Sequence, residues 1–198
     1  MNKEIPERSF MITGVPSVGK TELSRELYKL QDFIPHPPYT TRPLRVNECS
    51  SDMRSITEEE FLNLYALRRL IEGELNIPYE RTGYLGKRYG SPVDWMVVET
   101  HMHAAIGFVS FSTLIASVVK RSVGENVAWI HLTANEQVRR IRLAERKIPE
   151  EEITRRLANT DGDSHAYFDA ADLVVDTSSI SLTDEASMVL SYINRASI

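Results

Sequence analysis

The sequence has a single cysteine, Cys49, so it offers no internal disulfide bond and no cysteine-based zinc site. This scarcity is compatible with a reducing compartment, and we expect a cytoplasmic protein. Cys49 is interpreted as a small side chain in a loop, because little in its local sequence favours a reactive thiolate. Positive charge is also scarce. The net charge of −5 argues against binding to nucleic acid or to an anionic membrane, since either partner requires a broad basic face.

Long apolar runs are missing as well. The first ten residues, MNKEIPERSF, have no apolar core, so we expect no signal peptide. The longest uncharged stretch, residues 102–119, approaches the length of a membrane span, but it contains histidine, glycine and several hydroxyl side chains. That polar content is high for a hydrocarbon environment, which favours a buried strand followed by a helix. We therefore expect one soluble domain without repeats.

Strand and helix patterns alternate along the rest of the chain. SFMITG, residues 9–14, is a short apolar run that ends in glycine, and Leu23, Leu27 and Leu30 follow it at helical spacing. Further strand-length apolar runs are AIGFVSF, NVAWIHL and DLVV, separated by helix-patterned segments. This alternation predicts an α/β fold with a parallel sheet flanked by helices.

Two further features mark boundaries between these elements. The segment that follows the first helix pattern, residues 35–43, contains four prolines and is interpreted as a loop. Thr57 and Glu60 form a capping-box pattern, which predicts a helix from about Glu58. Thr133 and Glu136 form the same pattern before a later helix.

The stretch GVPSVGKT, residues 14–21, matches G-x-x-x-x-G-K-[ST] between a predicted strand and a predicted helix, the context that a phosphate-binding loop requires. Its backbone N–H groups would cradle phosphate oxygens, Lys20 would neutralise the outer phosphates of a nucleoside triphosphate, and the Thr21 hydroxyl would ligate Mg²⁺. Thr21 is therefore the candidate metal contact. The candidate ATP-binding residues are Gly14, Val15, Pro16, Ser17, Val18, Gly19, Lys20 and Thr21. The motif alone does not separate kinases from GTPases, motors or binding modules.

Two groups of arginines could hold a second anion. Arg42 and Arg45 lie in a proline-constrained loop, YTTRPLRVNE, where their guanidinium groups could fork around a phosphate, although a plain exposed loop is the alternative. The second group lies at helical spacing, with its last member on the next predicted helix: Arg139, Arg142, Arg146 and Arg156. Taken alone, such a stripe is usually a solvated face with acidic partners.

The order of these motifs resembles the guanylate kinase family across nearly the whole chain. The matching stretches are the phosphate loop, TTRPLRVNE, ITEEEF, YGSP and RLAERKIPEEEITRRL. The resemblance implies a P-loop NTPase-type fold with a core (8–32, 91–139 and 157–198), an inserted acceptor-binding subdomain (33–90) and a helical lid (140–156). It also implies an ATP-dependent, Mg²⁺-requiring kinase of a nucleoside monophosphate, with GMP or dGMP as the leading acceptor.

The resemblance also implies roles for individual residues. In the family, the T-T-R-x-x-R-x-x-E loop holds the acceptor phosphate, a Tyr-Gly-Ser/Thr turn contacts the acceptor nucleotide, and a glutamate nine residues before that tyrosine recognises guanine. The implied acceptor-binding residues here are Arg42, Arg45, Glu80, Tyr89 and Ser91. The family's lid delivers arginines to the transferring phosphoryl group. The implied catalytic residues are Lys20, Arg42, Arg142, Arg146 and Arg156.

Some positions depart from the family pattern. Pro38 stands where the family has a serine that contacts the base, and Met53 stands where it has a tyrosine on the acceptor phosphate. Ser110 and Ser112 replace an Asp-x-Asp that organises hydrated Mg²⁺ and helps to recognise guanine. Because Mg²⁺ prefers carboxylates, either Thr21, water and the nucleotide hold it alone, or another acid contributes, or catalysis is weak. The candidates for that acid are Asp172 and Asp176.

These departures leave two alternatives to GMP phosphorylation. One is a kinase of another phosphorylated acceptor, such as ribose bisphosphate or a different nucleotide. Ribose bisphosphate phosphokinases resemble the same fold and have a non-acidic pattern near Ser110 and Ser112, but Glu80 would then have no base to recognise. The other is a weakly catalytic or non-catalytic nucleotide-binding module, which the intact phosphate loop argues against. The expected partners are small-molecule nucleotides, and the sequence does not determine the oligomeric state.

Overall fold

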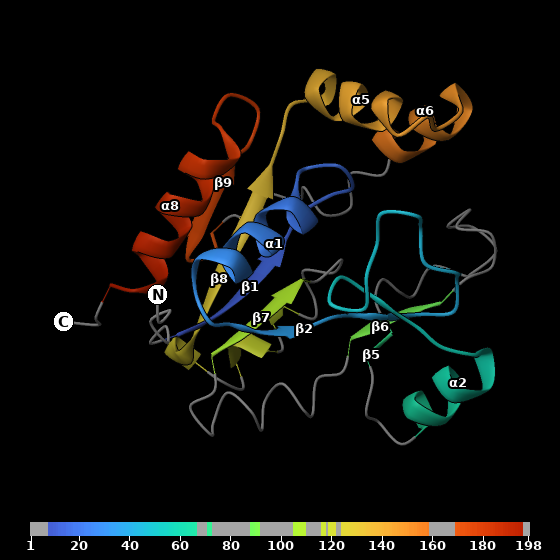
Figure 1. Cartoon of the computed structure of the whole chain (residues 1–198), viewed down its shortest axis with the longest axis horizontal. Coiled ribbons are helices and arrows are strands. Elements are labelled where there is room, and N and C mark those ends of the chain that lie inside the picture. The colour runs from blue at the N-terminus through green and yellow to red at the C-terminus, as the bar shows by residue number, and fades with distance from the viewer. Residues whose placement is uncertain are drawn as a thin grey trace.

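The protein is described by a computed structural model (Figure 1). The described residues are 8–66, 71–72, 88–91, 105–109, 116–117, 119–121, 124–158 and 169–195. Glu80, Ser110 and Ser112 lie outside them, so the roles inferred for these three residues stay predictions.

The core is a sheet of five parallel strands in the order β2-β7-β1-β8-β9. These strands are β1 (Ser9–Thr13), β2 (Ile34–His36), β7 (Ile106–Val109), β8 (Val127–Thr133) and β9 (Leu173–Asp176). The apolar runs identified in the sequence form β1, β7, β8 and β9. The prediction of a parallel sheet flanked by helices is therefore confirmed.

Strand β2 lies where the sequence predicted only a proline-rich loop, and strand β3 (Tyr39–Thr40) lies in the same stretch, so that prediction was wrong at both places. Pro35 is paired in register with Gly107 of β7. Proline cannot donate to a strand ladder, but β2 is at the edge of the sheet, where one side of the strand needs no partner. The edge position explains why the prolines did not prevent a strand.

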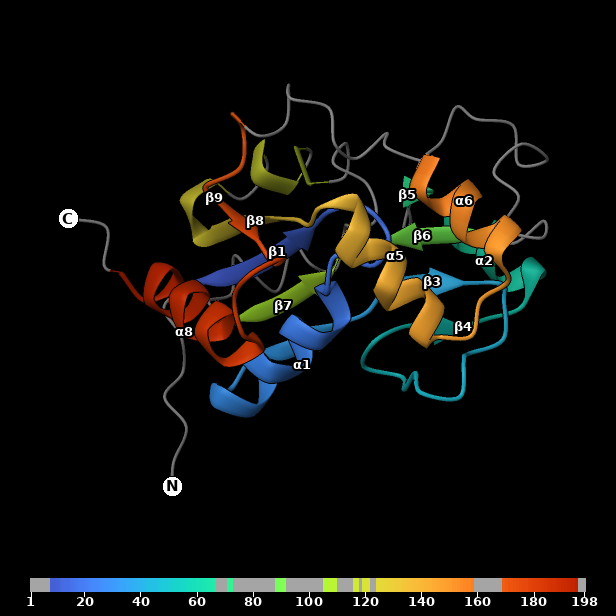
Figure 2. The same ribbon diagram turned by 90° about the horizontal axis from the view of Figure 1, so that it is seen from above.

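Helices α1 (Lys20–Leu30) and α8 (Leu182–Ile193) lie side by side on one face of this sheet (Figures 1 and 2). Phe10 of β1, Leu23 and Leu27 of α1 and Val189 of α8 are completely buried in one apolar cluster between these elements. Leu30, the third leucine of the predicted helical spacing, lies at the exposed end of α1. Packing on this face fixes the direction in which α1 leaves the phosphate loop.

A second sheet of four strands, in the order β4-β3-β6-β5, is formed by chain segments between β2 and β7. Its strands are β3 (Tyr39–Thr40), β4 (Arg54–Ser55), β5 (Ile71–Glu72) and β6 (Tyr89–Ser91). Helix α2 (Glu58–Ala66) follows β4. The predicted capping box is confirmed, because the Thr57 N–H donates to Glu60 Oε2 at 2.8 Å and the Glu60 N–H donates to Thr57 Oγ1 at 3.1 Å.

After β8 the chain forms the helix pair α5 (Glu136–Glu145) and α6 (Glu150–Ala158), joined by a small apolar cluster around Leu143 and Ile153. The predicted capping box of Thr133 and Glu136 was wrong. The chain stays in β8 through Thr133, and Asn135 caps α5 by accepting the Val138 N–H at 2.9 Å. A short 3₁₀ helix, Gly124–Asn126, precedes β8. Within the described ranges, none of the helices is long and apolar enough to cross a membrane.

Candidate functional site

The predicted phosphate loop connects β1, the central strand, to α1. Gly14 and Gly19 have φ of 140° and 104°, a region that side chains with a Cβ rarely adopt. A Cβ on Gly14 would lie 2.4 Å from the Leu132 carbonyl oxygen of the neighbouring strand. Gly19 caps α1 and brings no side chain to its first turn, so the helix N–H groups are available to an anion.

Lys20 and Ser17 show how this loop is prepared for a ligand. The Lys20 ammonium is buried and donates to the carbonyl oxygens of Gly14 and Val15 at 2.5 and 2.9 Å. Its charge is thereby held across the loop, where phosphate oxygens would be bound. The Ser17 hydroxyl is buried without a hydrogen-bond partner in the described part of the chain. A buried polar atom without a partner in a phosphate loop is consistent with a partner supplied by the nucleotide.

Helix α5 lies above the phosphate loop in Figure 1, and two of its arginines contact the loop. Arg139 is buried, and its Nε donates to the Pro16 carbonyl oxygen at 3.2 Å. Arg142 Nη1 donates to the Ser17 carbonyl oxygen at 3.3 Å, and a Cβ on Gly19 would lie 3.8 Å from that nitrogen. These arginines therefore do not form a solvated face.

Thr177 fixes Arg142 in this place. Its hydroxyl and carbonyl oxygens accept from Arg142 Nη1 and Nη2, both at 2.9 Å, and the hydroxyl itself donates to the Val18 carbonyl oxygen at 2.8 Å. Sequence analysis missed Thr177. The available signal was a hydroxyl residue immediately after a predicted parallel strand, because ligands bind outside the carboxyl ends of such strands.

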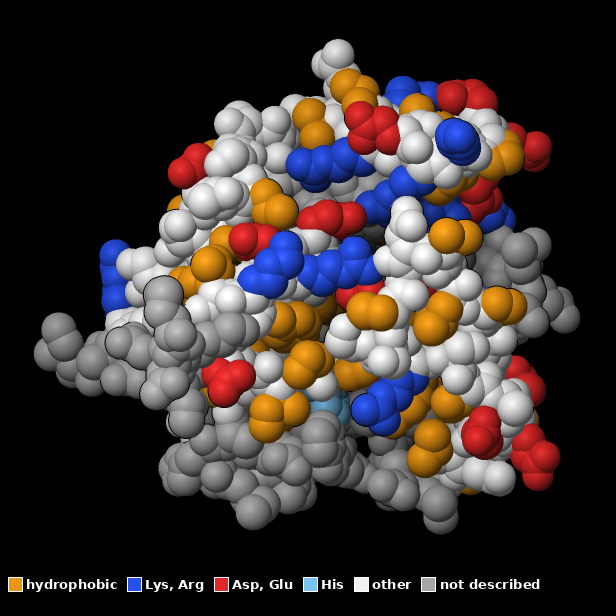
Figure 3. All heavy atoms as spheres, in the orientation of Figure 1, with side chains coloured by type: hydrophobic (Ala, Val, Ile, Leu, Met, Phe, Trp, Pro, Cys, Tyr) orange, Lys and Arg blue, Asp and Glu red, His pale blue; other side chains and the backbone are white. Residues whose placement is uncertain are grey.

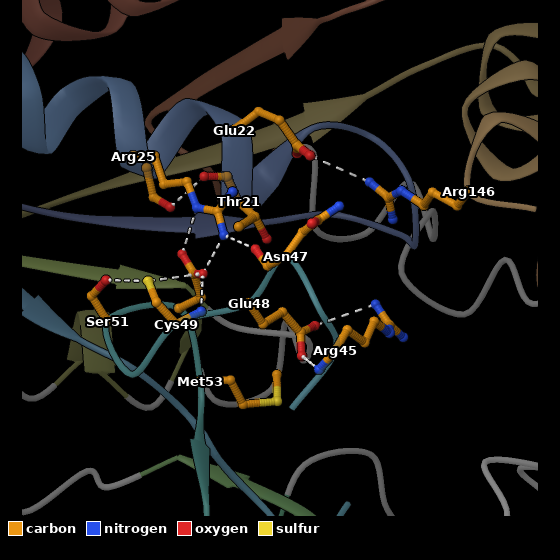
Figure 4. Close-up of polar contacts among 12 residues, drawn as sticks. Thr21, Glu22, Arg25, Arg45, Asn47, Glu48, Cys49, Ser51, Met53 and Arg146 are labelled. Carbon is orange, nitrogen blue, oxygen red and sulfur yellow. Dashed lines mark hydrogen bonds and ion pairs between the residues drawn. The ribbon is translucent and has the colours of Figure 1, made fainter. Parts of the chain in front are cut away.

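The other two arginines of this group, Arg146 and Arg156, are paired with carboxylates. Arg146 follows α5, and its Nη2 lies 3.5 Å from Glu22 Oε1 of α1 (Figure 4). Arg156 of α6 donates from Nε to Glu152 Oε1 at 2.7 Å. The helix pair α5–α6 thus contributes two loop-contacting arginines and two arginines held by neighbouring acids.

The loop between β3 and β4, residues 41–53, is called the acceptor loop below. Glu48 forks the guanidinium group of Arg42: Nη1 donates to Oε2 and Nη2 to Oε1, both at 2.7 Å. Arg42 Nε donates to the Tyr89 hydroxyl at 3.1 Å, and the buried Met53 places its Sδ 3.4 Å from Nη2. The structure therefore brings Arg42 and Tyr89 together, as the sequence predicted for one acceptor site.

Arg45 is the more accessible of the two loop arginines, with 48% of its side chain exposed. Its Nη1 lies 3.4 Å from Glu48 Oε1. Partial burial and the nearby cations Arg42 and Arg156 lower the pKa of Arg45. Burial opposes the change, but the bonds from the Arg42 guanidinium group and the Arg45 N–H lower the pKa of Glu48. Arginines of the acceptor loop and of α6 are thus close enough to interact, and Lys and Arg side chains lie across the middle of the face in Figure 3 with Asp and Glu side chains between them.

The remaining predicted acceptor residues are less fully defined. Ser91 ends β6, with its backbone paired to Ile71 of β5, and its side chain is outside the description. Glu80 also lies outside the described residues.

Thr21 occupies the first turn of α1, where its hydroxyl could serve a nucleotide-bound Mg²⁺. Of the two carboxylates considered as a further ligand, Asp172 does not fit. It accepts from Lys120 Nζ and from the Trp129 N–H, both at 2.7 Å, at the far end of β9 from the phosphate loop. Asp176 lies at the correct end of β9, where its Oδ1 accepts the Ser178 N–H. Among the described residues, no group of three or more His, Cys, Asp or Glu side chains is placed to hold a metal ion.

No protein-family model and no curated protein sequence matches the chain. Solved structures match its fold. A guanylate kinase from Anaplasma phagocytophilum has a TM-score of 0.67 at 16% identity, covering 98% of this chain and 90% of that one. An uncharacterized protein from Eubacterium ventriosum has a TM-score of 0.55 at 9% identity, with 96% and 99% covered. A shikimate kinase from Acinetobacter baumannii, in complex with shikimate, has a TM-score of 0.51 at 13% identity, with 96% and 94% covered. The chain therefore has the P-loop kinase fold.

Proposed function

We propose that this chain is an ATP-dependent phosphotransferase that moves the γ-phosphoryl group of ATP to a nucleoside monophosphate, with GMP or dGMP as the leading acceptor. One observation carries the proposal: the loop that bears Arg42 and Arg45 is hydrogen-bonded, through its Asn47 carbonyl oxygen, to Arg25 of α1, the helix that follows the phosphate loop (Figure 4). Phosphoryl transfer mainly requires that two anions be positioned and their charge be stabilised.

The residues divide this work between two sites. The phosphate loop N–H groups and Lys20 hold the triphosphate, and Arg142 adds positive charge next to the loop. Mg²⁺ bound with ATP would neutralise the outer phosphate oxygens, and Thr21 would hold it together with water and the nucleotide. Arg42 and Arg45 bind the acceptor phosphate. Charge that spreads over the transferring group is stabilised by fixed cations in place before the reaction.

The preference for guanine rests on Glu80 and on the family resemblance. A carboxylate facing the base accepts from both N1–H and the 2-amino group of guanine, whereas adenine has no donor at N1. A site built on such contacts can reject the analogue that lacks them by up to about 10⁴-fold. Ser110 and Ser112, in place of the family's acidic pair, favour the alternative of another phosphorylated acceptor such as ribose bisphosphate. A weakly catalytic nucleotide-binding module is the remaining alternative.

An ADP-release assay with Mg²⁺-ATP and a panel of acceptors tests the proposal. The panel holds the common ribo- and deoxyribonucleoside monophosphates and ribose bisphosphate. We expect the highest kcat/KM with GMP or dGMP, and we expect Glu80→Gln to lower it far more for guanine nucleotides than for the others. Lys20→Met should abolish turnover with every acceptor, because it removes the cation that neutralises the transferring phosphate.

Each other result selects an alternative. A higher kcat/KM for ribose bisphosphate than for GMP would replace the nucleotide by a sugar phosphate. If nucleotides bind but no acceptor causes ADP release, the chain is the non-catalytic nucleotide-binding module. Full turnover by a folded Lys20→Met variant would contradict the kinase proposal itself.

A further inference from the structure

Arg25 joins the helix that follows the phosphate loop to the acceptor loop. It lies one turn after Thr21 on α1, and its side chain points away from the core (Figure 4). Its Nε donates to Asp52 Oδ1 at 2.8 Å, and its Nη2 donates to Asp52 Oδ2 and, at 2.5 Å, to the Asn47 carbonyl oxygen. One guanidinium group therefore holds the acceptor loop at Asn47 and at Asp52. Both positions follow Arg42 and Arg45, the proposed phosphate-binding arginines of the loop.

Asp52 is built into a turn that surrounds its carboxylate. Only 3% of its side chain is exposed. Besides Arg25, its Oδ2 accepts from the Cys49 N–H at 2.8 Å and from the Cys49 thiol at 3.2 Å. The N–H groups of Asp52 and Met53 close the turn on the Cys49 carbonyl oxygen. Although burial opposes the change, the bonds from Arg25 and Cys49 lower the pKa of Asp52. The pair is therefore charged throughout the neutral range.

The same part of α1 also contacts the helix pair α5–α6, through Glu22 and Arg146 at 3.5 Å. Both of these side chains are substantially exposed, and an exposed single ion pair contributes little. The link from Arg25 differs because it is bidentate and its acid is buried, so removal of the cation leaves an uncompensated charge. Of the two contacts, the Arg25 link is the one able to hold a loop in place.

We propose that Arg25 is a positioning residue that ties the acceptor loop to α1 and thereby sets the distance between the two phosphate sites. Lys20 and Thr21 begin α1, and Arg25 lies on the same rigid helix. The segment from Asn47 to Asp52 is fixed to that helix, and Glu48 within it holds Arg42. In-line transfer needs the reacting atoms within about 3.5 Å, and a misplacement of about 1 Å can cost about 10²-fold in rate.

The chemistry of this inference rests on the proposed function, so its test combines a kinetic measurement with one that needs no activity. The kinetic measurement compares Arg25→Gln with Lys29→Gln. Lys29 is a matched control, because it is a cation on the same helix that pairs within the helix, with Glu26. We expect Arg25→Gln to lower kcat/KM for the acceptor at least tenfold while the Kd for ATP changes less than twofold, and Lys29→Gln to change neither. Arg25→Lys should recover only part of the loss, because lysine cannot fork around a carboxylate.

The second measurement uses Cys49, the single cysteine of the chain, as a reporter of the acceptor loop. Its thiol is bonded to Asp52 and Ser51, and the turn that holds it is fixed by Arg25. The reaction of this thiol with an aromatic disulfide reagent should be several-fold faster in Arg25→Gln than in wild type, and unchanged in Lys29→Gln. Melting temperatures verify that each variant is folded.

Arg25→Gln leaves the Asp52 carboxylate without its cation, so a double variant separates loss of the tie from loss of folding. Arg25→Gln/Asp52→Asn carries two neutral amides, and we expect it to be folded and to lose no more kcat/KM than Arg25→Gln alone. A clearly larger loss of kcat/KM in the double variant than in Arg25→Gln would show that Asp52 has a separate role, and it would overturn the proposal.

The outcomes separate the tie from the kinase proposal. If the Cys49 thiol reacts at the same rate in Arg25→Gln as in wild type, Arg25 does not hold the acceptor loop, whatever the activity of the variant. A faster thiol reaction with unchanged kcat/KM shows a tied loop that does not position the acceptor, which also overturns the proposal. Absence of transfer by the wild-type protein, with a faster thiol reaction in the variant, overturns the proposed function and retains the tie.

Discussion

Glu185 is a carboxylate placed inside the protein close to the candidate site. It lies in the first turn of α8, only 4% of the residue is exposed, and its Oε1 has no hydrogen-bond partner in the described part of the chain. Burial raises its pKa to about 7, with Arg142 opposing and Glu22 reinforcing the change. Neither the helix pattern nor the charge pattern of the sequence identified it, because its environment depends on how α8 packs against α1.

We expect Glu185 to make the protein less stable as the pH rises. A glutamate in the unfolded chain titrates at about 4.3, so the folded protein holds this proton more tightly. Its stabilising contribution is complete below pH 4.3 or so and is lost as the pH rises through about 7. Urea denaturation from pH 5 to pH 9 measures this. The free energy of unfolding should fall for wild type by on the order of 2 kcal/mol more than for Glu185→Gln.

Glu136→Gln is the control for this prediction, since 71% of that side chain is exposed. It should follow the wild-type profile. Parallel profiles for wild type and Glu185→Gln would show that Glu185 is ionised in the folded protein at neutral pH, contrary to the prediction.

At the scale of elements, local patterns predicted what depends on neighbouring residues. Three features depend only on residues close together in the chain. They are the apolar run of β1, the glycines and Lys20 of the phosphate loop, and the capping box before α2. Two errors came from contacts that the sequence does not show. Pro35 joins a strand because that strand is at the sheet edge, and α5 begins later than Thr133 because sheet pairing extends β8 to that residue.

The helix α5 provides a prediction with an internal control. Arg142 contacts the phosphate loop, whereas Arg140, on the same helix, pairs with Glu136 and Glu150 at the surface. We expect Arg142→Ala to lower kcat by about 10²-fold with little change in the KM of the acceptor, because a fixed cation acts most strongly on the charge of the transition state. Arg146→Ala should change kcat in the same direction. Steady-state kinetics with the best acceptor measure both.

Arg140→Ala should stay within about twofold of wild type, since exposed ion pairs contribute little. If Arg142→Ala raised only the KM of the acceptor, Arg142 would bind the ground state, and its assignment to the transferring group would be wrong.

At the scale of the whole molecule, the candidate site consists of segments far apart in sequence. Thr177 meets Arg142 across 35 positions, and Asp52 meets Arg25 across 27. Residue types and spacing identified the phosphate loop and both arginine groups, because each lies within one segment. They could not identify Arg25 or Asp52, whose roles exist only after the two sheets and the helix pair have packed together.

The two phosphate sites of the proposed kinase predict strong binding of a ligand that spans both. Adenosine and guanosine joined through five phosphates should bind about 10²-fold tighter than ATP or GMP alone, because the second contact becomes intramolecular. At ligand concentrations near the Kd values of ATP and GMP, it should therefore raise the melting temperature more than ATP and GMP added together at equal concentrations. Two adenosines joined in the same way are the matched control and should bind more weakly. Equal melting temperatures with the linked and the separate nucleotides would contradict the two-site arrangement.

The fork of Glu48 on Arg42 has a consequence for which metabolites can enter. An incoming ligand must displace a carboxylate that already satisfies the guanidinium group with two bonds of 2.7 Å. A metabolite whose only anion is another carboxylate gains nothing by this exchange, whereas a phosphate monoester brings a charge of about −1.5 to −2 at neutral pH. In the proposed acceptor site, Glu48 thus disfavours monocarboxylates and favours phosphate monoesters.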